Sequence, residues 1–119
     1  MGFKEDEKTG AFSKEKREHP RVSIQLKIKL KRSQEEYAEF DVVRNLSLGG
    51  AFVETKRVFH VNDILDFTLY LEGGVTLLKG KLRVVRCALE PIQGLGLQFL
   101  ELTQSQKNKL KKIIDSTLQ

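Results

Sequence analysis

Two arginines spaced four residues apart, Arg17 and Arg21, are the first residues of this sequence whose type and spacing could bind a ligand. Pro20 lies between them and favours extended backbone at His19, so the two arginines are not expected on one helix face. A guanidinium group offers a planar set of donors that matches phosphate oxygens or the O6 and N7 atoms of guanine. The pair therefore predicts a site for an anionic, planar ligand, with a solvated basic linker as the alternative.

A second candidate is the segment Asn45-x-Ser47-x-x-Gly50, which separates two stretches of strand-like sequence. Asn and Ser side chains often bond backbone amides in turns, and Gly49 and Gly50 add backbone freedom, so an ordinary turn is one interpretation. In the functional interpretation, the Asn45 amide and the Ser47 hydroxyl point outward to the edge of a base. Gly50 would then let the backbone approach the ligand closely.

The sequence lacks the common patterns of catalysis and metal binding. It contains no P-loop and no GxSxG nucleophile motif. Cys87 is the single cysteine, which excludes an intrachain disulfide and a Cys-based zinc site, and we expect it to be a semi-buried strand residue. His19 and His60 are the only histidines and lack metal-ligand spacing. We therefore predict that the protein is not an enzyme and holds no metal or cofactor.

Length and charge restrict the class of protein further. The 119 residues are 39% hydrophobic and 31% charged, which fits one soluble globular domain. The net charge of +5 suits an anionic ligand but does not by itself indicate a nucleic-acid-binding protein. No apolar run approaches the roughly 20 residues that span a bilayer, and the N-terminus lacks the apolar stretch of a secretory signal. We predict a cytoplasmic location and no membrane insertion.

Alternating apolar residues predict the strands that must position these candidates. Residues 22–30 alternate through five repeats, the pattern of a half-buried antiparallel strand. Further strands are predicted at residues 37–43, 51–54, 65–71, 75–86 and 95–100, separated by turn-forming residues. Gly80 is expected to mark a bend or bulge in the longest of these strands.

A helix is predicted to begin at Thr103, which has capping-box spacing to Gln106 and precedes one apolar stripe, Leu110, Ile113, Ile114 and Leu118. Residues 1–15 are charged and predict a flexible arm, followed by a single domain at residues 16–119. Six short strands and one helix predict a mostly β fold. We expect a small six-stranded antiparallel barrel whose open end is covered by the C-terminal helix.

Taken together, Arg17-x-x-x-Arg21 and Asn45-x-Ser47-x-x-Gly50 in a small barrel resemble the PilZ domain family. The strand sequence GLGLQF at residues 94–99 and the helix after it extend the resemblance to about residues 16–118. PilZ domains are bacterial receptors for the second messenger cyclic di-GMP. The resemblance therefore implies binding of this dinucleotide and an output through a changed surface for an unidentified protein partner.

The resemblance also implies roles for the motif residues. Arg17 and Arg21 would contact the phosphates and guanines, while Asn45 and Ser47 would read a guanine edge beside Gly50. Asn45 stands where Asp is more frequent in the family. An amide keeps an acceptor oxygen but adds donors and loses the charge, which would alter affinity without removing the site.

Additional residues could join the site. Lys16 occupies a position that, in the family, influences whether one ligand or an intercalated pair binds, and we expect a pair. Gly49 belongs to the second motif's turn. Arg44 and Arg86 lie at predicted strand ends and could contact phosphates, with ordinary surface arginines as the alternative.

Two other functions stay open. One is a PilZ-like adaptor that acts through protein contacts without binding nucleotide. The other is a small basic barrel that binds nucleic acid, a class that needs exposed aromatic side chains to stack on bases. The chain has no Trp, and we expect Phe40, Phe52, Phe67 and Phe99 to face the core. We therefore expect cyclic di-GMP and a protein as partners rather than nucleic acid.

Overall fold

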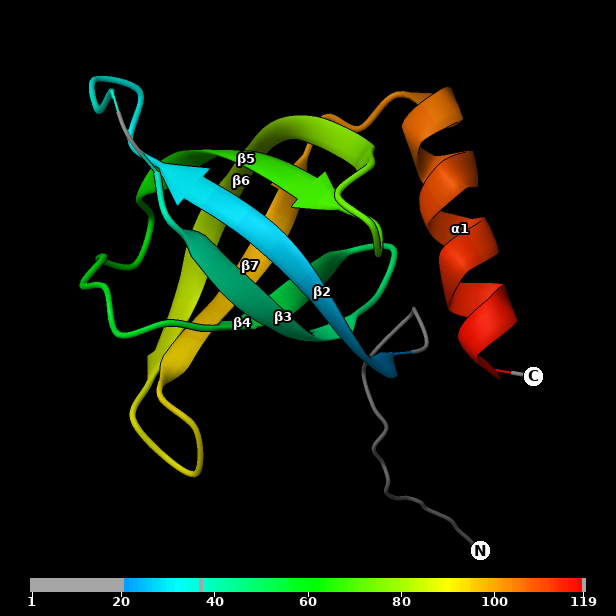
Figure 1. Cartoon of the computed structure of the whole chain (residues 1–119). Coiled ribbons are helices and arrows are strands. Elements are labelled where there is room, and N and C mark those ends of the chain that lie inside the picture. Colours follow the sequence, from blue (N-terminus) through cyan, green and yellow to red (C-terminus); the bar gives the residue numbers. More distant parts are fainter. Residues whose placement is uncertain (1–20, 37, 119) are drawn as a thin grey trace, which may run out of the picture.

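The computed structural model describes residues 21–36 and 38–118 of the chain (Figure 1). The predicted arm at residues 1–15 and the candidate residues Lys16 and Arg17 lie outside these ranges, as does Tyr37, the predicted start of the second strand. Within them, no helix has the length and apolar character needed to cross a membrane.

Six strands of the described chain close into an antiparallel barrel in the order β2-β3-β4-β7-β6-β5 (Figure 1). The elements are β2 (Val22–Lys31), β3 (Phe40–Leu46), β4 (Gly50–Glu54), β5 (Ile64–Tyr70), β6 (Thr76–Ala88), β7 (Gly94–Leu100) and helix α1 (Gln104–Leu118). Strand β4 pairs with β7 and not with β5, which follows it in the chain. The predicted mostly β fold, a six-stranded antiparallel barrel with a C-terminal helix, is confirmed.

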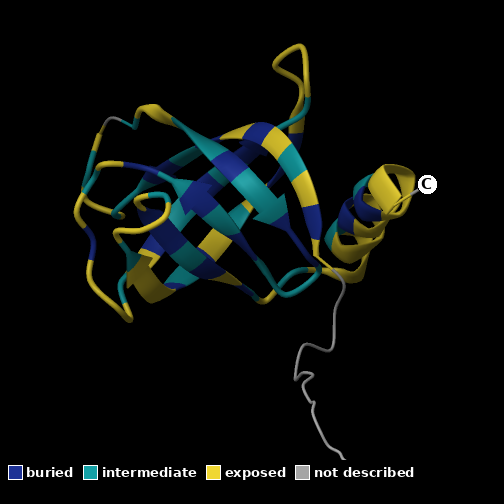
Figure 2. Cartoon of the chain, turned by 90° about the horizontal axis from the view of Figure 1, so that it is seen from below, coloured by how far each residue is buried: buried dark blue, intermediate teal, exposed yellow. Residues whose placement is uncertain are grey.

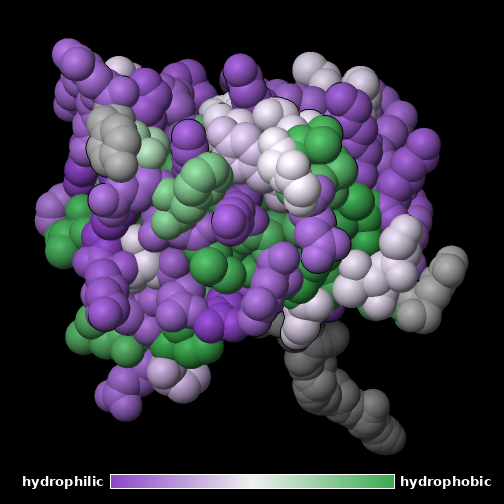
Figure 3. All heavy atoms as spheres, viewed as in Figure 1, coloured by the Kyte–Doolittle hydropathy of each residue, from purple (hydrophilic) through white to green (hydrophobic). Residues whose placement is uncertain are grey.

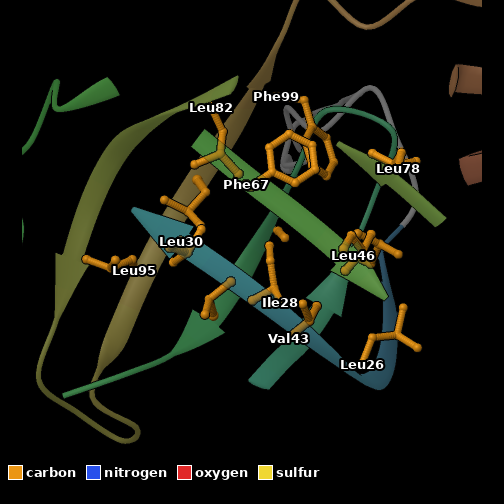
Figure 4. Packing of buried hydrophobic residues seen from close by; sticks show 14 of the residues in the cluster. Leu26, Ile28, Leu30, Val43, Leu46, Phe67, Leu78, Leu82, Leu95 and Phe99 are labelled. Carbon is orange, nitrogen blue, oxygen red and sulfur yellow. The ribbon is translucent and has the colours of Figure 1, made fainter. Parts of the chain in front are cut away.

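Alternation along the strands separates a core from an outer surface. In β2, Leu26, Ile28 and Leu30 are buried, whereas Lys27 and Lys29 point outward. The same alternation recurs around the barrel (Figure 2), and buried side chains from all six strands meet inside it (Figure 4). Burial of one such Leu or Ile side chain stabilises the fold by about 1.5–3 kcal/mol. Function must therefore lie on the outward-facing residues.

An extra residue on one strand interrupts the regular pairing in four strand pairs, which are β2 with β3, β5 with β6, β3 with β4 and β6 with β7. The register of β3 against β4 shifts at Arg44, and that of β6 against β7 shifts at Val85. Gly80 lies in regular pairing with Phe67, and a Cβ on it would stand 3.3 Å from the phenyl ring. The irregularity of β6 against β7 is thus at Val85 and not at the predicted Gly80.

Helix α1 begins at the predicted capping box. The Thr103 amide donates to Gln106 Oε1 (2.9 Å), and the Gln106 amide donates to Thr103 Oγ1 (3.1 Å). Leu110 and Ile114 are buried where the helix packs against β2 and β6. Leu118, predicted to continue the apolar stripe, is 57% exposed, so the stripe ends before the last turn.

The four phenylalanines expected in the core divide into two pairs. Phe67 and Phe99 are buried, with ring centroids 5.4 Å apart. Phe40 is 52% exposed and Phe52 is half-buried on the outer face, so the prediction was wrong for these two. In β4, the residues on either side of Phe52 point inward, and alternation therefore turns Phe52 outward.

Candidate ligand-binding site

A row of paired residues crosses four neighbouring strands on the outside of the barrel. Asn45 of β3 pairs with Phe52 of β4, Phe52 with Gly96 of β7, and Gly96 with Arg86 of β6. The bulges at Arg44 and Val85 each lie one residue before a member of this row, and bulges re-aim the side chains next to them. We call Asn45, Phe52, Gly96 and Arg86 the outer row.

Within the outer row, Arg86 lies over an aromatic ring. Its guanidinium carbon is 5.4 Å from the centroid of the Phe52 ring. A Cβ on Gly96 would stand 3.3 Å from the Cβ and 3.6 Å from the Nε of Arg86, so the missing side chain leaves room for the arginine to cross β7. The result is an exposed planar cation beside a phenyl ring, an arrangement that can stack on a flat ligand.

Among residues 21–36 and 38–118, no acidic side chain balances the charge of Arg86. No carboxylate in the described part of the chain forms an ion pair with it. Because a guanidinium is always ionised, an exposed and unpaired one favours an anionic partner.

A hollow of about 230 Å³ opens beside the outer row. Its walls come from β3, β4, β6 and the β6–β7 connection, with the residues Arg44, Asn45, Phe52, Arg86, Ala88, Glu90, Pro91 and Ile92. A second hollow of about 550 Å³ shares Arg44, Pro91 and Ile92 with the first and continues along β3 and β4. Volumes of several hundred Å³ are typical of small-molecule sites.

Arg21 reaches the outer row from the start of β2. Its Nη1 donates to Asn45 Oδ1 in a long hydrogen bond of 3.4 Å. Asn45 also pairs with Ser23 in the ladder between β2 and β3, which fixes the start of β2 beside it. The structure thus brings a residue of the arginine motif into contact with a residue of the second motif.

Ser47 and its glycine neighbours organise the turn between β3 and β4. Ser47 is 6% exposed, and its Oγ accepts the amides of Gly49 and Gly50, both at 3.2 Å. Gly50 pairs with Gln98, and a Cβ there would collide with the carbonyl oxygen of Leu97. The Ser47 hydroxyl therefore points into the turn, as in the first of the two interpretations of this segment, and Gly50 is needed for the close approach of β7.

Arg44, a further candidate, is engaged within the protein. Its Nε and Nη2 contact Oε1 of Glu54 at 2.6 and 2.5 Å. Arg44 lines both hollows, and Glu90 lines the smaller one. Arg44 therefore forms part of the wall of the hollows, and Glu54 balances most of its charge. Arg86, in contrast, has no carboxylate partner among the described residues.

Phe52 and Gly96 are residues of the candidate site that sequence reasoning missed. The alternation of β4 could have placed Phe52 outward, because the small and β-branched residues beside it suit the core. The adjacency of Phe52, Gly96 and Arg86 depends on the bulge in β6, and no local pattern in the sequence marks it.

Two other expectations concern catalytic and metal chemistry. Across residues 21–36 and 38–118, no group of three His, Cys, Asp or Glu side chains is placed to hold a metal ion. Cys87, expected to be semi-buried, is exposed, and its thiol donates to the carbonyl of Phe59 at 3.4 Å.

Comparisons with known proteins agree with the architecture. The model of the PilZ domain family matches residues 15–116. The structure is similar to the PilZ domain of YcgR from Escherichia coli with c-di-GMP, at 14% identity and a TM-score of 0.68, covering 87% of this chain and 92% of that one. It is also similar to the MrkH–c-di-GMP complex of K. pneumonia, at 16% identity and a TM-score of 0.71. A third similar structure is the Bacillus subtilis inhibitor of motility MotI, at 19% identity and a TM-score of 0.69.

Two of these matches cover only part of the other protein. Each of the last two similarities covers 87% of this chain but only 52% of the other protein, so the chain spans about half the length of MotI and MrkH. No curated protein sequence matches the chain. At identities below 20%, the likeness to solved structures concerns the fold.

Proposed function

The chain belongs to the PilZ domain family, and we propose that it is a receptor for cyclic di-GMP that binds at the outer row. The observation that carries the proposal is the convergence of Arg21, Asn45 and Arg86 on one outer surface beside a hollow. Cyclic di-GMP offers two phosphates and two guanines, which match guanidinium groups and an outward amide. The similar structures of YcgR and MrkH hold this ligand.

Each residue of the site has a distinct role in this proposal. Arg17 and Arg21 bind the phosphates and the guanine O6 and N7 atoms, while Asn45 bonds a guanine edge through its amide. Arg86 stacks on a guanine with Phe52 beneath it, and Gly96 leaves the space in which both can lie.

The residues of the turn act indirectly. Ser47 holds the amides of Gly49 and Gly50, and this fixes the backbone that presents Asn45. Arg44 lines the hollow, and its pairing with Glu54 keeps it in place. Lys16, next to the first motif arginine, favours the binding of an intercalated ligand pair.

The proposed mechanism is regulatory and not catalytic. Arg17 and Arg21 precede the first barrel strand, so ligand binding draws the N-terminal segment across the outer row. The surface around Asn45 and Arg86 then changes, and an unidentified protein partner recognises the difference. The ligand supplies the free energy through contacts made only in the bound arrangement.

The experiment is a calorimetric titration of the full chain with cyclic di-GMP, with GTP and cyclic GMP as controls. We expect saturable binding of the cyclic dinucleotide alone, with two ligands per chain. Arg21→Ala should weaken binding by about 10- to 100-fold, because a charge-assisted hydrogen bond contributes about 1.5–3 kcal/mol. Lys109→Ala, which changes an exposed helix lysine, is the matched control and should bind like the wild type.

The outcomes separate the candidate functions. Absence of heat and of thermal stabilisation at millimolar cyclic di-GMP would contradict the receptor and leave an adaptor that acts without nucleotide. Full affinity in a variant lacking both Arg17 and Arg21 would contradict the assigned site while leaving the receptor function intact.

A further inference from the structure

A second outer surface, away from the outer row, is rich in lysine. Lys27, Lys29 and Lys31 alternate along the outside of β2, and Lys79 and Lys81 lie at outward positions of β6. Strand β5 lies between β2 and β6 and aligns four of these lysines in two cross-strand rows, Lys29–Thr68–Lys79 and Lys31–Asp66–Lys81. We call these five lysines the lysine face; the β2 side of it is turned toward the viewer in Figures 1 and 3, where hydrophilic side chains are mixed with hydrophobic ones.

Most of the charge on the lysine face is uncompensated. Asp66 is the only carboxylate in the two rows, and it is ion-paired with Lys81 at 2.6 Å. Lys27, Lys29 and Lys79 have no carboxylate partner among the residues that the structure describes. An anionic partner would supply the missing counter-charges.

An exposed aromatic pair adjoins these lysines. Phe40 of β3 and Tyr70 of β5 meet across β2 with ring centroids 5.4 Å apart and an interplanar angle of 67°. The Nζ of Lys29 lies 4.7 Å from the Phe40 centroid and 5.9 Å from that of Tyr70, and the Nζ of Lys27 lies 5.4 Å from that of Phe40. With Phe40 half exposed, an apolar anchor point lies directly among the cations.

A hollow of about 360 Å³ lies beside the aromatic pair. Leu26, Leu71, Gly73 and Gly74 are among the residues that line it. Glu72 also lines it and is the acidic group on that side. The hollow can take one apolar side chain of a partner whose acidic groups reach the lysines.

We propose that the lysine face docks an extended acidic segment of a partner protein. Alternate residues of β2 stand about 6.7 Å apart, which is also the spacing of alternate side chains in an extended peptide. Carboxylates at every second position can therefore meet Lys27, Lys29 and Lys31 in succession. An apolar residue in the same segment packs against Phe40 in the adjoining hollow.

The local geometry favours an acidic polypeptide over a nucleic acid. Bases need open ring faces on which to stack, but ammonium groups of Lys27 and Lys29 lie over the Phe40 ring. The rows also contain lysine without arginine, whose planar fork suits phosphate and bases better. This docking surface contains no residue of the outer row and stands or fails independently of cyclic di-GMP binding.

The test is fluorescence anisotropy with the full chain and a labelled peptide, Glu-Ser-Glu-Ser-Phe-Ser-Glu-Ser-Glu. We expect the peptide to bind at low salt and to bind more weakly as the salt concentration rises. A control peptide with Lys in place of each Glu should not bind. The double variant Lys27→Glu, Lys29→Glu should weaken binding at least tenfold. Lys109→Glu, Lys112→Glu makes the same change of charge on the exposed side of α1 and should leave binding unchanged.

Further variants and probes make the outcome decisive. Phe40→Ser should weaken binding of the peptide but not abolish its salt dependence, and Arg21→Ala should have no effect on it. No binding of the acidic peptide, or equal loss in both double variants, would overturn the proposal. Tighter, Lys27- and Lys29-dependent binding of oligo(dT) or of vesicles containing 30% phosphatidylserine would overturn it in favour of another anionic partner.

Discussion

Arginine lies over phenylalanine in two regions of the barrel, and the two regions differ in what surrounds the charge. In the first, the guanidinium carbons of Arg32 and Arg57 lie 4.6 and 4.8 Å from the centroid of Phe59, which is 4% exposed. In the second, Arg86 lies 5.4 Å from the half-buried Phe52. We call the first region the Phe59 cluster.

Carboxylates account for the difference. In the Phe59 cluster, Glu35 Oε1 lies 3.4 Å from Nη2 of Arg57, and Asp63 Oδ2 lies 3.7 Å from Nη2 of Arg32. Arg57 also donates to the carbonyl oxygen of Leu30. Arginine and phenylalanine thus attach the connection between β4 and β5 to the barrel where carboxylates balance the charge of the arginines. Where it is not balanced, as at the outer row, they are available to a ligand.

The largest expected effect is on stability, from Arg57→Ala in the Phe59 cluster. The variant loses the contact with Phe59, the bond to Leu30 and one of the two arginine partners of Glu35, which keeps its bonds to Arg32. We expect the free energy of unfolding to fall by about 2–3 kcal/mol, since several contacts of a partly buried side chain are lost together. Urea denaturation measures this. A change below about 0.5 kcal/mol would show that the cluster does not hold the fold.

Arg86→Ala should reverse this pattern. Because Arg86 is exposed and has no carboxylate partner among the described residues, the free energy of unfolding should change by less than about 0.5 kcal/mol. Affinity for cyclic di-GMP should fall by about tenfold or more through loss of a charged contact. Calorimetry with Arg86→Ala and Lys109→Ala side by side makes the comparison. Unchanged affinity in both variants would remove Arg86 from the site.

Ser47→Ala should have an intermediate effect that spans both properties. The hydroxyl accepts two amides of the turn, and its loss should lower the free energy of unfolding by about 1 kcal/mol. Affinity should fall by a few fold because the turn presents Asn45. Ser47→Thr keeps the hydroxyl and is the matched variant. A large loss of affinity with no loss of stability would instead indicate direct contact with the ligand.

The smallest effect concerns Asp41, which faces Arg57 at 3.9 Å beside the Phe59 cluster. Burial raises the pKa of Asp41 above its ordinary value, although a hydrogen bond from Thr55 and the charge of Arg57 oppose this. A raised pKa in the folded state means that the contribution of Asp41 to stability is present at low pH and is lost as the pH rises through the folded pKa.

Asp41→Asn cannot ionise and therefore removes this pH dependence. Relative to the wild type, the variant should become progressively more stable between pH 3 and pH 6, as followed by urea denaturation at each pH. The opposite trend would mean that the ion pair with Arg57 outweighs the burial of the carboxylate.

Sequence reasoning succeeded where one local pattern sets the structure. Five alternating repeats predict β2, and the spacing of Thr103 and Gln106 predicts the cap of α1. Sequence reasoning failed where the pairing of strands far apart in the sequence determines which residues lie side by side. The bulges at Arg44 and Val85 exist only relative to the neighbouring strands, and these shifts align Asn45, Phe52, Gly96 and Arg86.

Orientation was also harder to predict than residue type. The motif identified Ser47 and Gly50, but their roles in the turn follow from the buried hydroxyl and from the approach of β7. Phe52 was assigned to the core by its hydrophobicity, although the alternation of β4 turns it outward. The sequence therefore predicted the barrel and named Asn45 and Arg86 of the outer row, but not the surface that they share with Phe52 and Gly96.

The most direct test of the central claim is a nuclear magnetic resonance titration of the ¹⁵N-labelled full chain with cyclic di-GMP. We predict that amide shifts concentrate at Asn45, Phe52, Arg86 and Gly96, while Phe59 and its neighbours stay unchanged. Shifts centred on the Phe59 cluster, or an unperturbed outer row at saturating ligand, would contradict the proposal that the uncompensated arginine marks the binding site.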